Sequence, residues 1–198
     1  MLTCSNIRYL SSVFKMVPTL FVFDLDACLW SPEMYELDSA PTTYDVKRGG
    51  VKAGRDTVKL YPGAQTVLKR LITEDCFKNC KIAAASSTTE PAYALTCLEQ
   101  MPIDDSGQRT TVMADLIKFR QIYNGSKGRE HFPRLKDETG VAYSEMIFFD
   151  DCSYSDNCKE VAKLCPGVTC VRTPRGLSVD EFNAGLLAFT KGEKGVVR

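Results

Sequence analysis

The chain has 198 residues, of which 44% are hydrophobic, and this length is typical of one globular domain. Its 25 Lys and Arg residues balance 25 Asp and Glu residues, so a formal net charge of zero provides no field that would attract nucleic acid or an anionic membrane. No apolar run approaches the roughly 20 residues that a transmembrane helix needs. We therefore expect a soluble protein that binds neither nucleic acid nor membrane.

Cysteine and histidine usage argues against a disulfide framework or a zinc site. The nine cysteines are scattered without a C-x-x-C pair, and His131 is the single histidine. We expect His131 to be a helix-surface or packing residue. A reduced, cytoplasmic compartment fits this usage best.

The N-terminal segment has an unusual composition. Residues 1–23 contain Arg8, Lys15 and several serines but no acid, which is also compatible with a mitochondrial or other organelle transit peptide. We expect residues 1–16 to be a disordered or targeting tail, and residues 17–192 to form the folded domain.

The first predicted strand is TLFVF, residues 19–23, and Asp24 and Asp26 follow it. A strand that is apolar on both faces is typical of the buried centre of a parallel sheet, where an unpaired charge is expensive. The two acids are therefore expected past the C-terminal end of the strand. In an open α/β sheet, ligands bind at that edge.

A long connection and a helix come next. Residues 31–59 contain two prolines and three glycines and far exceed the usual length of a βα loop. This short insertion is either a small flap or hairpin at the mouth of a site, or a tolerated surface insertion. A crossover helix should then begin at Pro62, with its apolar face formed by Val67, Leu68, Leu71 and Ile72.

A second short buried strand, KIAAA at residues 81–85, ends in a run of hydroxyl side chains. The run lies where a strand gives way to a helix N-terminus, so hydroxyls and unpaired backbone N–H groups point the same way. This is the outline of an anion site, although an ordinary N-cap explains the segment as well. The run consists of Ser86, Ser87, Thr88 and Thr89.

The next segments are less regular. A third strand is expected around Val112–Phe119, although MADLIKF also has helical spacing. Lys127 follows among turn residues at the entry to a helical segment. Because Pro133 interrupts that segment, the helix is either kinked or begins near His131.

Two more strands complete the predicted sheet. Residues 145–149 (EMIFF) form the fourth strand, which ends in the adjacent acids Asp150 and Asp151, and residues 168–171 (VTCV) form the fifth. The last helix is marked by a capping box, with Ser178 as N-cap. The alternation of strands and helices predicts an α/β fold, a doubly wound parallel sheet with helices on both faces.

Four loops of this sheet share one edge. Several carboxylates should converge there, and two carboxylates about 4 Å apart repel by roughly 1 kcal/mol in water and by roughly 4 kcal/mol at an effective dielectric of 20. A divalent cation relieves such crowding, and magnesium favours carboxylates together with water and phosphate oxygens. The converging residues are Asp24, Asp26, Ser86, Lys127, Asp150 and Asp151.

These motifs carry a clear resemblance. DLDACLW at residues 24–30 resembles the first motif of the haloacid dehalogenase (HAD) superfamily, D-x-D-x-[TVC], and Ser86, Lys127 and the FFDD of residues 148–151 follow in that superfamily's order. Within it, the chain closely resembles the acid phosphatase-like, magnesium-dependent phosphatase family, which shares FDLD-x-x-LW, AAS, GSK and HF-x-RL. The resemblance extends from about Leu20 to Thr190.

The resemblance implies specific catalytic roles and a Mg²⁺ cofactor. Asp24 would be the nucleophile that forms an aspartyl-phosphate, and Asp26 would be the general acid and then the general base. The metal would be held by Asp24, by the backbone carbonyl of Asp26 and directly by Asp151, with Asp150 acting indirectly or through water. Expected ligands of the phosphoryl oxygens are Ser86, Ser87 and Lys127.

The sequence departs from the family pattern at two positions. Cys28 stands where the family usually has threonine, and Ser87 stands where close relatives often have arginine. The second change removes a bidentate donor, so it affects the expected substrate preference more than the chemistry.

We predict a magnesium-dependent phosphomonoesterase without a large cap domain, acting on phosphotyrosine-type protein or small sugar phosphate substrates. A phosphoaspartate receiver-like signalling domain also combines acids, a hydroxyl and a lysine, but it has no use for a second acid such as Asp26. A catalytically silent HAD-like protein-interaction module stays open as well, because each acid taken alone fits a loop cap.

Overall fold

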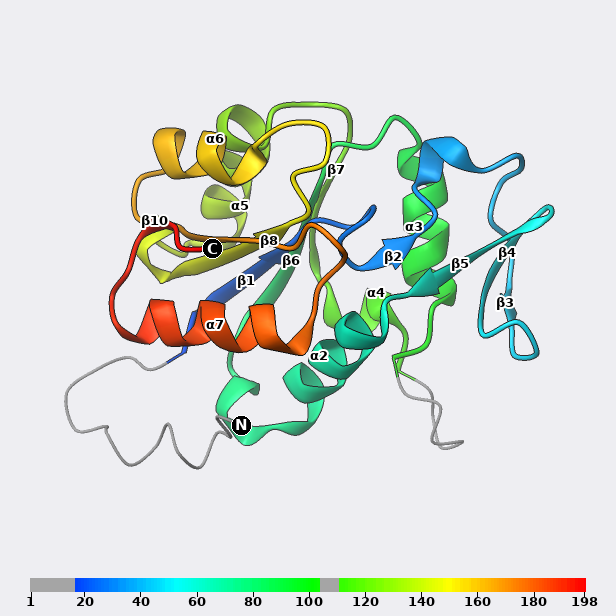
Figure 1. Ribbon diagram of the computed structural model, residues 1–198, viewed down its shortest axis with the longest axis horizontal. Helices are drawn as coiled ribbons and strands as arrows, with labels where there is room; N and C mark the ends of the chain where they lie inside the picture. The colour runs from blue at the N-terminus through cyan, green and yellow to red at the C-terminus, as the bar shows by residue number, and fades with distance from the viewer. Residues whose placement is uncertain (1–16, 104–110) are drawn as a thin grey trace.

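The protein was analysed as a computed structural model that describes residues 17–103 and 111–198, so the predicted tail, 1–16, lies outside the described residues. A six-stranded sheet with the order β10-β9-β8-β1-β6-β7 forms its centre, and every neighbouring pair in it is parallel (Figure 1). The predicted parallel α/β fold is confirmed. The strands are β1 (Leu20–Phe23), β6 (Lys81–Ser86), β7 (Phe119–Ile122), β8 (Met146–Asp150), β9 (Thr169–Arg172) and β10 (Gly195–Val196).

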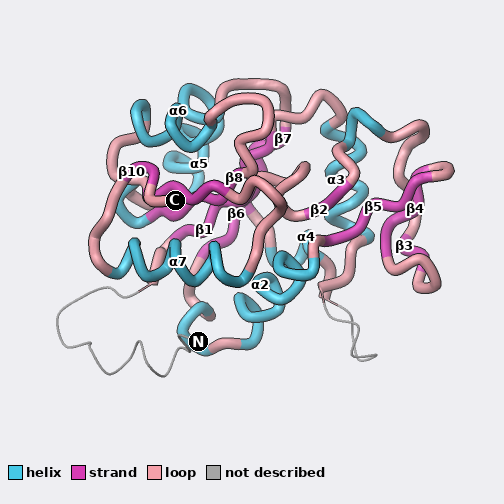
Figure 2. Tube along the Cα trace, in the orientation of Figure 1, coloured by secondary structure: helices cyan, strands magenta, loops and turns pink. Residues whose placement is uncertain are grey.

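Helices cover both faces of this sheet, as Figures 1 and 2 show. Alternate residues of β1 serve the two layers: Phe21 and Phe23 belong to one buried cluster, whereas Leu20 and Val22 belong to the other. The first cluster includes side chains of α2 (Pro62–Thr73), α3 (Pro91–Gln100), α4 (Met113–Leu116) and α7 (Val179–Thr190). The second includes side chains of α5 (Phe132–Thr139) and α6 (Asn157–Leu164).

The connection after β1 builds a second, antiparallel sheet with the order β2-β5-β4-β3. It extends sideways from the parallel sheet (Figure 2). Gly50 allows two of its strands to approach closely, because a Cβ at this position would lie 2.4 Å from the carbonyl oxygen of Val58. The strands are β2 (Trp30–Ser31), β3 (Tyr44–Asp45), β4 (Gly50–Ala53) and β5 (Asp56–Leu60), and the 3₁₀ turn η1 (Met34–Glu36) lies between β2 and β3.

The structure corrects two details of the prediction. The strand expected around Val112–Phe119 is wrong, because Met113–Leu116 is helical and β7 begins only at Phe119. Met113 and Ile117 are buried, but Asp115 between them is exposed, although a strand would place all three on one face. The backbone N–H of Ile117 donates to the carbonyl of Met113 over 2.8 Å, the hydrogen bond of a helical turn. In α2, Ile72 is 41% exposed, and Ala64 takes its place on the buried face.

Two other local predictions are confirmed. Ser178 accepts a hydrogen bond from the backbone N–H of Glu181 and forms the predicted capping box of α7. The α-helix begins near His131, the second of the two alternatives: a π-helical turn, η3 (Lys127–His131), leads directly into α5 at Phe132, with Pro133 in its first turn. Two further 3₁₀ turns are η2 (Asp75–Phe77) and η4 (Tyr143–Glu145).

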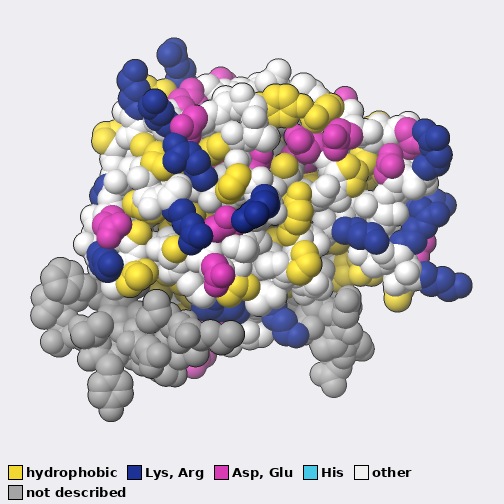
Figure 3. Space-filling model, in the orientation of Figure 1, with side chains coloured by type: hydrophobic (Ala, Val, Ile, Leu, Met, Phe, Trp, Pro, Cys, Tyr) yellow, Lys and Arg dark blue, Asp and Glu magenta, His cyan; other side chains and the backbone are white. Residues whose placement is uncertain are grey.

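Charged side chains of both signs lie on the surface of the protein (Figure 3). Acidic and basic side chains are interspersed over much of the face drawn in Figure 3, although Lys and Arg gather near the antiparallel sheet. Among the described residues, no helix combines the length and the apolar character that crossing a bilayer requires.

Candidate active site

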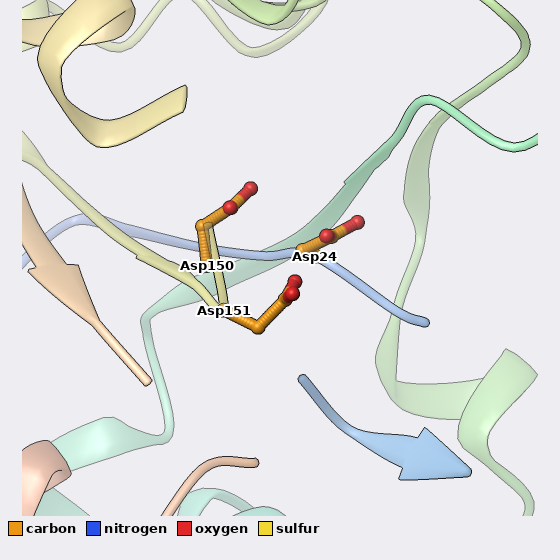
Figure 4. Close-up of side chains that lie close together, drawn as sticks. All are labelled: Asp24, Asp150 and Asp151. Carbon is orange, nitrogen blue, oxygen red and sulfur yellow. The ribbon is translucent and has the colours of Figure 1, made fainter. Parts of the chain in front are cut away.

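Three aspartates meet at the C-terminal edge of the parallel sheet. Asp24 directly follows β1, Asp150 is the last residue of β8 and Asp151 follows it. The backbone N–H of Asp24 donates to the carbonyl of Phe149 over 2.9 Å, so the ends of the two strands are held side by side. One carboxylate oxygen from each aspartate lies within 4.8 Å of the others, and the three side chains converge in Figure 4. All three aspartates are buried.

Lys127 is the counter-charge of this cluster. It is the first residue of η3 and is only 1% exposed. Its Nζ lies 2.9 Å from Oδ2 of Asp24 and 2.5 Å from Oδ2 of Asp150. Burial alone would lower the pKa of Lys127, but the two carboxylates outweigh burial and raise it, so the ammonium group stays charged.

The pKa of Asp24 is raised well above its usual value, mainly because the carboxyl is removed from water. Lys127 opposes this rise, whereas the neighbouring Asp150 and Asp151 add to it. Three buried carboxylates with one ammonium group leave an excess of negative charge. The cluster therefore suits a divalent cation, whose preferred ligands are carboxylate oxygens.

Asp150 and Asp151 differ in their hydrogen bonds. Besides Lys127, Asp150 accepts from the backbone N–H of Cys152 at 2.8 Å and from the side-chain amide of Asn157 at 3.1 Å and 3.2 Å, so both of its oxygens are engaged. Asp151 accepts from the backbone N–H of Ser153 at 2.9 Å through Oδ2. Among the described residues, hydrogen bonds to Asp151 engage Oδ2, so its other oxygen, Oδ1, is available to a ligand.

Asp26 is held apart from the cluster. The indole Nε1 of Trp30 donates to its Oδ1 over 2.6 Å, and the backbone N–H of Met34 and the hydroxyl of Thr88 also bond to its carboxylate. Burial raises the pKa of Asp26, and these donors partly offset the rise. Ala27, directly after Asp26, has a φ of 54°, a left-handed conformation that redirects the chain at this point.

The hydroxyl run after β6 lines the same cavity, and none of its members is the N-cap of α3. Glu90 takes the N-cap position instead, so the ordinary N-cap explanation is wrong for this segment. Ser86 is only 1% exposed at the end of β6. The hydroxyl of Ser87 donates to the carbonyl of Gly125 over 2.8 Å and ties this loop to the one that carries Lys127.

Cys28 occupies a fully buried position behind the site. Its thiol lies 3.6 Å from the carbonyl oxygen of Phe149, and the hydroxyl of Thr173 donates to its sulfur over 3.4 Å. Burial raises the pKa of the Cys28 thiol well above its usual value, so it stays protonated. The thiol thus forms the kind of contacts that a hydroxyl would form here.

The site opens into a cavity of about 710 Å³. Sequence reasoning missed several side chains that line it, among them Glu33 and Tyr35 from the insertion and Tyr154 from the loop after β8. Burial raises the pKa of Glu33 to about 7, with the carboxylates of Asp26 and Asp151 adding to the rise. The positions of Glu33, Tyr35 and Tyr154 beside the motif residues depend on how the insertion and the loop after β8 fold. No local sequence pattern indicates these positions.

His131 is a packing residue at the end of η3. It is fully buried, its Nε2 lies 3.2 Å from the carbonyl oxygen of Tyr123, and its ring packs edge-on against the Tyr123 ring at 4.3 Å. Burial lowers the pKa of His131 to about 4, and the positive charge of Lys127 acts in the same direction. The ring is therefore neutral near pH 7.

Comparisons with known proteins agree with this geometry. The Acid Phosphatase family model matches residues 16–192. The human protein named magnesium-dependent phosphatase 1 is 37% identical over 186 residues, 92% of this chain and 93% of its own length. A HAD-like hydrolase superfamily protein of Schizosaccharomyces pombe is 30% identical over 88% of this chain and 93% of its own length.

The fold is shared with solved structures at much lower sequence identity. A haloacid dehalogenase-like family hydrolase from Xanthomonas campestris superposes with a TM-score of 0.55 at 12% identity, over 90% of this chain and 97% of the other. This likeness concerns the fold alone. Because the family model covers most of the sequence and two relatives match it over nearly their whole lengths, the chain belongs to the Acid Phosphatase family, within the HAD-like superfamily.

Proposed function

We propose that this protein is a magnesium-dependent phosphomonoesterase that acts through an aspartyl-phosphate on Asp24. The observation that carries the proposal is the separation of two acids on one turn. Asp24 belongs to the buried cluster with Lys127, whereas Asp26, two residues later, is held by the Trp30 indole. A displacement at phosphorus needs this division between a nucleophile and a proton carrier.

The proposed cofactor is supported by the aspartate cluster and by the name of the human relative. Asp24, Asp151 and the backbone carbonyl of Asp26 would hold the ion, while Asp150 keeps Lys127 and Asn157 in place. Bound magnesium would supply positive charge that reduces the repulsion between the nucleophile and the phosphoryl oxygens. Both oxygens of Asp150 accept hydrogen bonds, whereas one oxygen of Asp151 is available, so Asp151 is the proposed direct ligand of the ion.

In the first step, a carboxylate oxygen of Asp24 would attack phosphorus while the bond to the leaving oxygen breaks. Lys127, 2.9 Å from Oδ2 of Asp24, favours the ionised carboxylate that this attack requires. The leaving oxygen would take its proton from Asp26, whose pKa is raised by burial and which is therefore better able to carry one.

In the second step, water would attack the aspartyl-phosphate. Asp26, now a carboxylate, would take the proton of that water, and the bond between phosphorus and the Asp24 oxygen would break to release inorganic phosphate. Each acid returns to its initial protonation state, so the cycle closes without another reactant. The trigonal phosphoryl group would meet donors from Ser86 and Lys127, which line the same cavity, whereas the hydroxyl of Ser87 already donates to the carbonyl of Gly125.

The proposed substrates are phosphotyrosine-type protein phosphates or small sugar phosphates. The cavity of about 710 Å³ is large enough for either type of group, and its rim is formed by loops. The insertion contributes Glu33 and Tyr35 to that rim, which supports a role for this segment in substrate access.

The test is hydrolysis of phenyl phosphate and of a sugar phosphate by the purified protein, with magnesium and with a chelator. Asp24→Asn keeps the size of the side chain but removes its charge, and it should abolish turnover. Asp180→Asn, an exposed acid in the first turn of α7, is the matched control and should retain activity. Turnover by the Asp24→Asn protein, or none by the native protein with magnesium, would refute the proposal and favour a binding module.

A further inference from the structure

The lining of the active-site cavity has an uneven chemistry. Its side chains are carboxylates, hydroxyls, one amide and the buried Lys127, and two tyrosines provide the aromatic surface. The phosphoryl ligands lie at the buried floor, where Ser86 and Lys127 are each 1% exposed. Tyr35 and Tyr154, in contrast, are 51% and 77% exposed at the rim.

The two tyrosines contact one another across the rim. Their hydroxyl oxygens lie 2.5 Å apart in a hydrogen bond, and their rings meet edge-on with centroids 6.0 Å apart at 74°. They are 119 positions apart in the sequence. Tyr35 belongs to the insertion, and Tyr154 belongs to the loop that follows Asp151, so the pair joins these two segments at the opening of the cavity.

Each ring is carried by an anchored piece of backbone. Met34, next to Tyr35, is fully buried, and the side chain of Glu36 accepts from the backbone N–H of Glu33 to close the η1 turn. On the other side, Ser153, next to Tyr154, donates its backbone N–H to Asp151. Both rings are therefore positioned relative to the aspartates rather than placed on unrestrained loops.

We propose that Tyr35 and Tyr154 are specificity-determining residues that bind the ring of an aryl leaving group. This inference rests on the proposed function. With the phosphoryl group at the floor, the remainder of the substrate extends toward the rim, where two tyrosine rings offer edge and face contacts. An aromatic ring gains stacking energy from such contacts, whereas a small polyol gains little. Glu160 on the lining repels an additional negative charge, whereas Asp156 is already paired with Arg172, so the favoured leaving group is a neutral aryl.

The experiment compares two double variants. Tyr35→Leu with Tyr154→Leu removes both rings, whereas Tyr35→Phe with Tyr154→Phe removes only the hydroxyls. The substrates are phenyl phosphate and glycerol 2-phosphate, with magnesium. In the leucine variant, KM for phenyl phosphate should rise about 3- to 10-fold, while the kinetic constants for glycerol 2-phosphate stay within about twofold. The phenylalanine variant should retain the native preference for phenyl phosphate.

Retained turnover of glycerol 2-phosphate shows that a variant is folded and that its chemistry is intact. An unchanged ratio of the two substrates in the leucine variant, or an equal loss in the phenylalanine variant, would overturn the inference.

Binding separates this inference from the proposed function. Phenylphosphonate and methylphosphonate are not hydrolysed, and calorimetry with magnesium measures their affinities whether or not the protein is an enzyme. Phenylphosphonate should bind more tightly, and the leucine variant should lose that advantage. Equal affinities for the native protein, or no binding of either, would overturn the role of the tyrosines. A native protein that shows the binding preference but no turnover would refute only the proposed function.

Discussion

The indole Nε1 of Trp30 donates a hydrogen bond to Oδ1 of Asp26 over 2.6 Å. The two residues are four positions apart, but the chain between them turns through Ala27 instead of forming a helix. Trp30 is fully buried, so a rigid side chain of the core orients the proposed proton carrier.

Trp30→Phe should therefore impair turnover in a manner that depends on the leaving group. General acid catalysis contributes about 10²- to 10⁴-fold, and a poorly oriented Asp26 should lose part of this factor. Because Asp26 also acts in the second step, the comparison uses kcat/KM, which reports the first step, and we expect kcat/KM for phenyl phosphate to fall about tenfold. With 4-nitrophenyl phosphate, whose leaving group departs without a proton, the loss should be about threefold or less.

The control for Trp30→Phe is the same substitution made in a protein that already carries Asp26→Asn. In that protein there is no acid to orient, so adding Trp30→Phe should have no further effect on kcat/KM for phenyl phosphate. Equal losses on the two aryl phosphates would show that Trp30 acts only through packing.

Lys127→Met tests the charge balance of the aspartate cluster. The variant leaves Asp24 and Asp150 buried without their partner, so the free energy of unfolding in chelator should fall by about 3–5 kcal/mol, as measured by urea denaturation. Adding Asp150→Asn removes one of the stranded charges and should recover part of the loss. If the double variant were less stable than Lys127→Met alone, charge imbalance would not be the cause.

Ser86 and Ser87 should differ in their effect on catalysis. Ser86 is buried at the end of β6, so its hydroxyl is well placed to bond a phosphoryl oxygen, and Ser86→Ala should lower kcat/KM about 10- to 100-fold. Ser87 already donates to the carbonyl of Gly125, so Ser87→Ala should cost about threefold or less. The kinetic constants of the two proteins, measured side by side, decide the matter, and the reverse ranking would assign the phosphate contact to Ser87.

His131 should make stability depend on pH. Its pKa is about 4 in the folded protein, against 6.5 for the free side chain, so the unfolded chain binds more protons between these values. The stabilising contribution is complete above about pH 6.5 and is lost as the pH falls toward 4. The native protein should thus lose about 2 kcal/mol between pH 7 and pH 5 that a His131→Phe variant does not lose. Parallel stability curves from urea unfolding at several pH values would contradict this assignment.

The sequence predicted the edge of the sheet well because its signal is local. Apolar runs that end in acids or hydroxyls can be recognised one strand at a time, and the parallel arrangement then brings Asp24, Ser86 and Asp150 together. The segment around Met113 is ambiguous in the sequence because a short apolar stretch fits both periods, and the hydrogen bond from Ile117 to the carbonyl of Met113 shows that it is helical.

The antiparallel sheet and the rim of the site could not be predicted in the same way. Strands such as β3 (Tyr44–Asp45) contain two residues and have no readable period. The contact of Tyr35 with Tyr154 joins residues 119 positions apart. Its geometry follows from how the insertion folds against the loop after β8, and no local pattern encodes that packing.

The central claim is the covalent intermediate on Asp24, and the Asp26→Asn protein with 4-nitrophenyl phosphate and magnesium tests it most directly. The activated leaving group departs without an acid, but the variant has no base to activate water, so the phosphoenzyme should accumulate with a burst of nitrophenol. After an acid quench, mass spectrometry of the peptides should find the phosphoryl group on Asp24, and borohydride should convert that residue to homoserine. Turnover without a burst, or a phosphoryl group on any other side chain, would contradict the account.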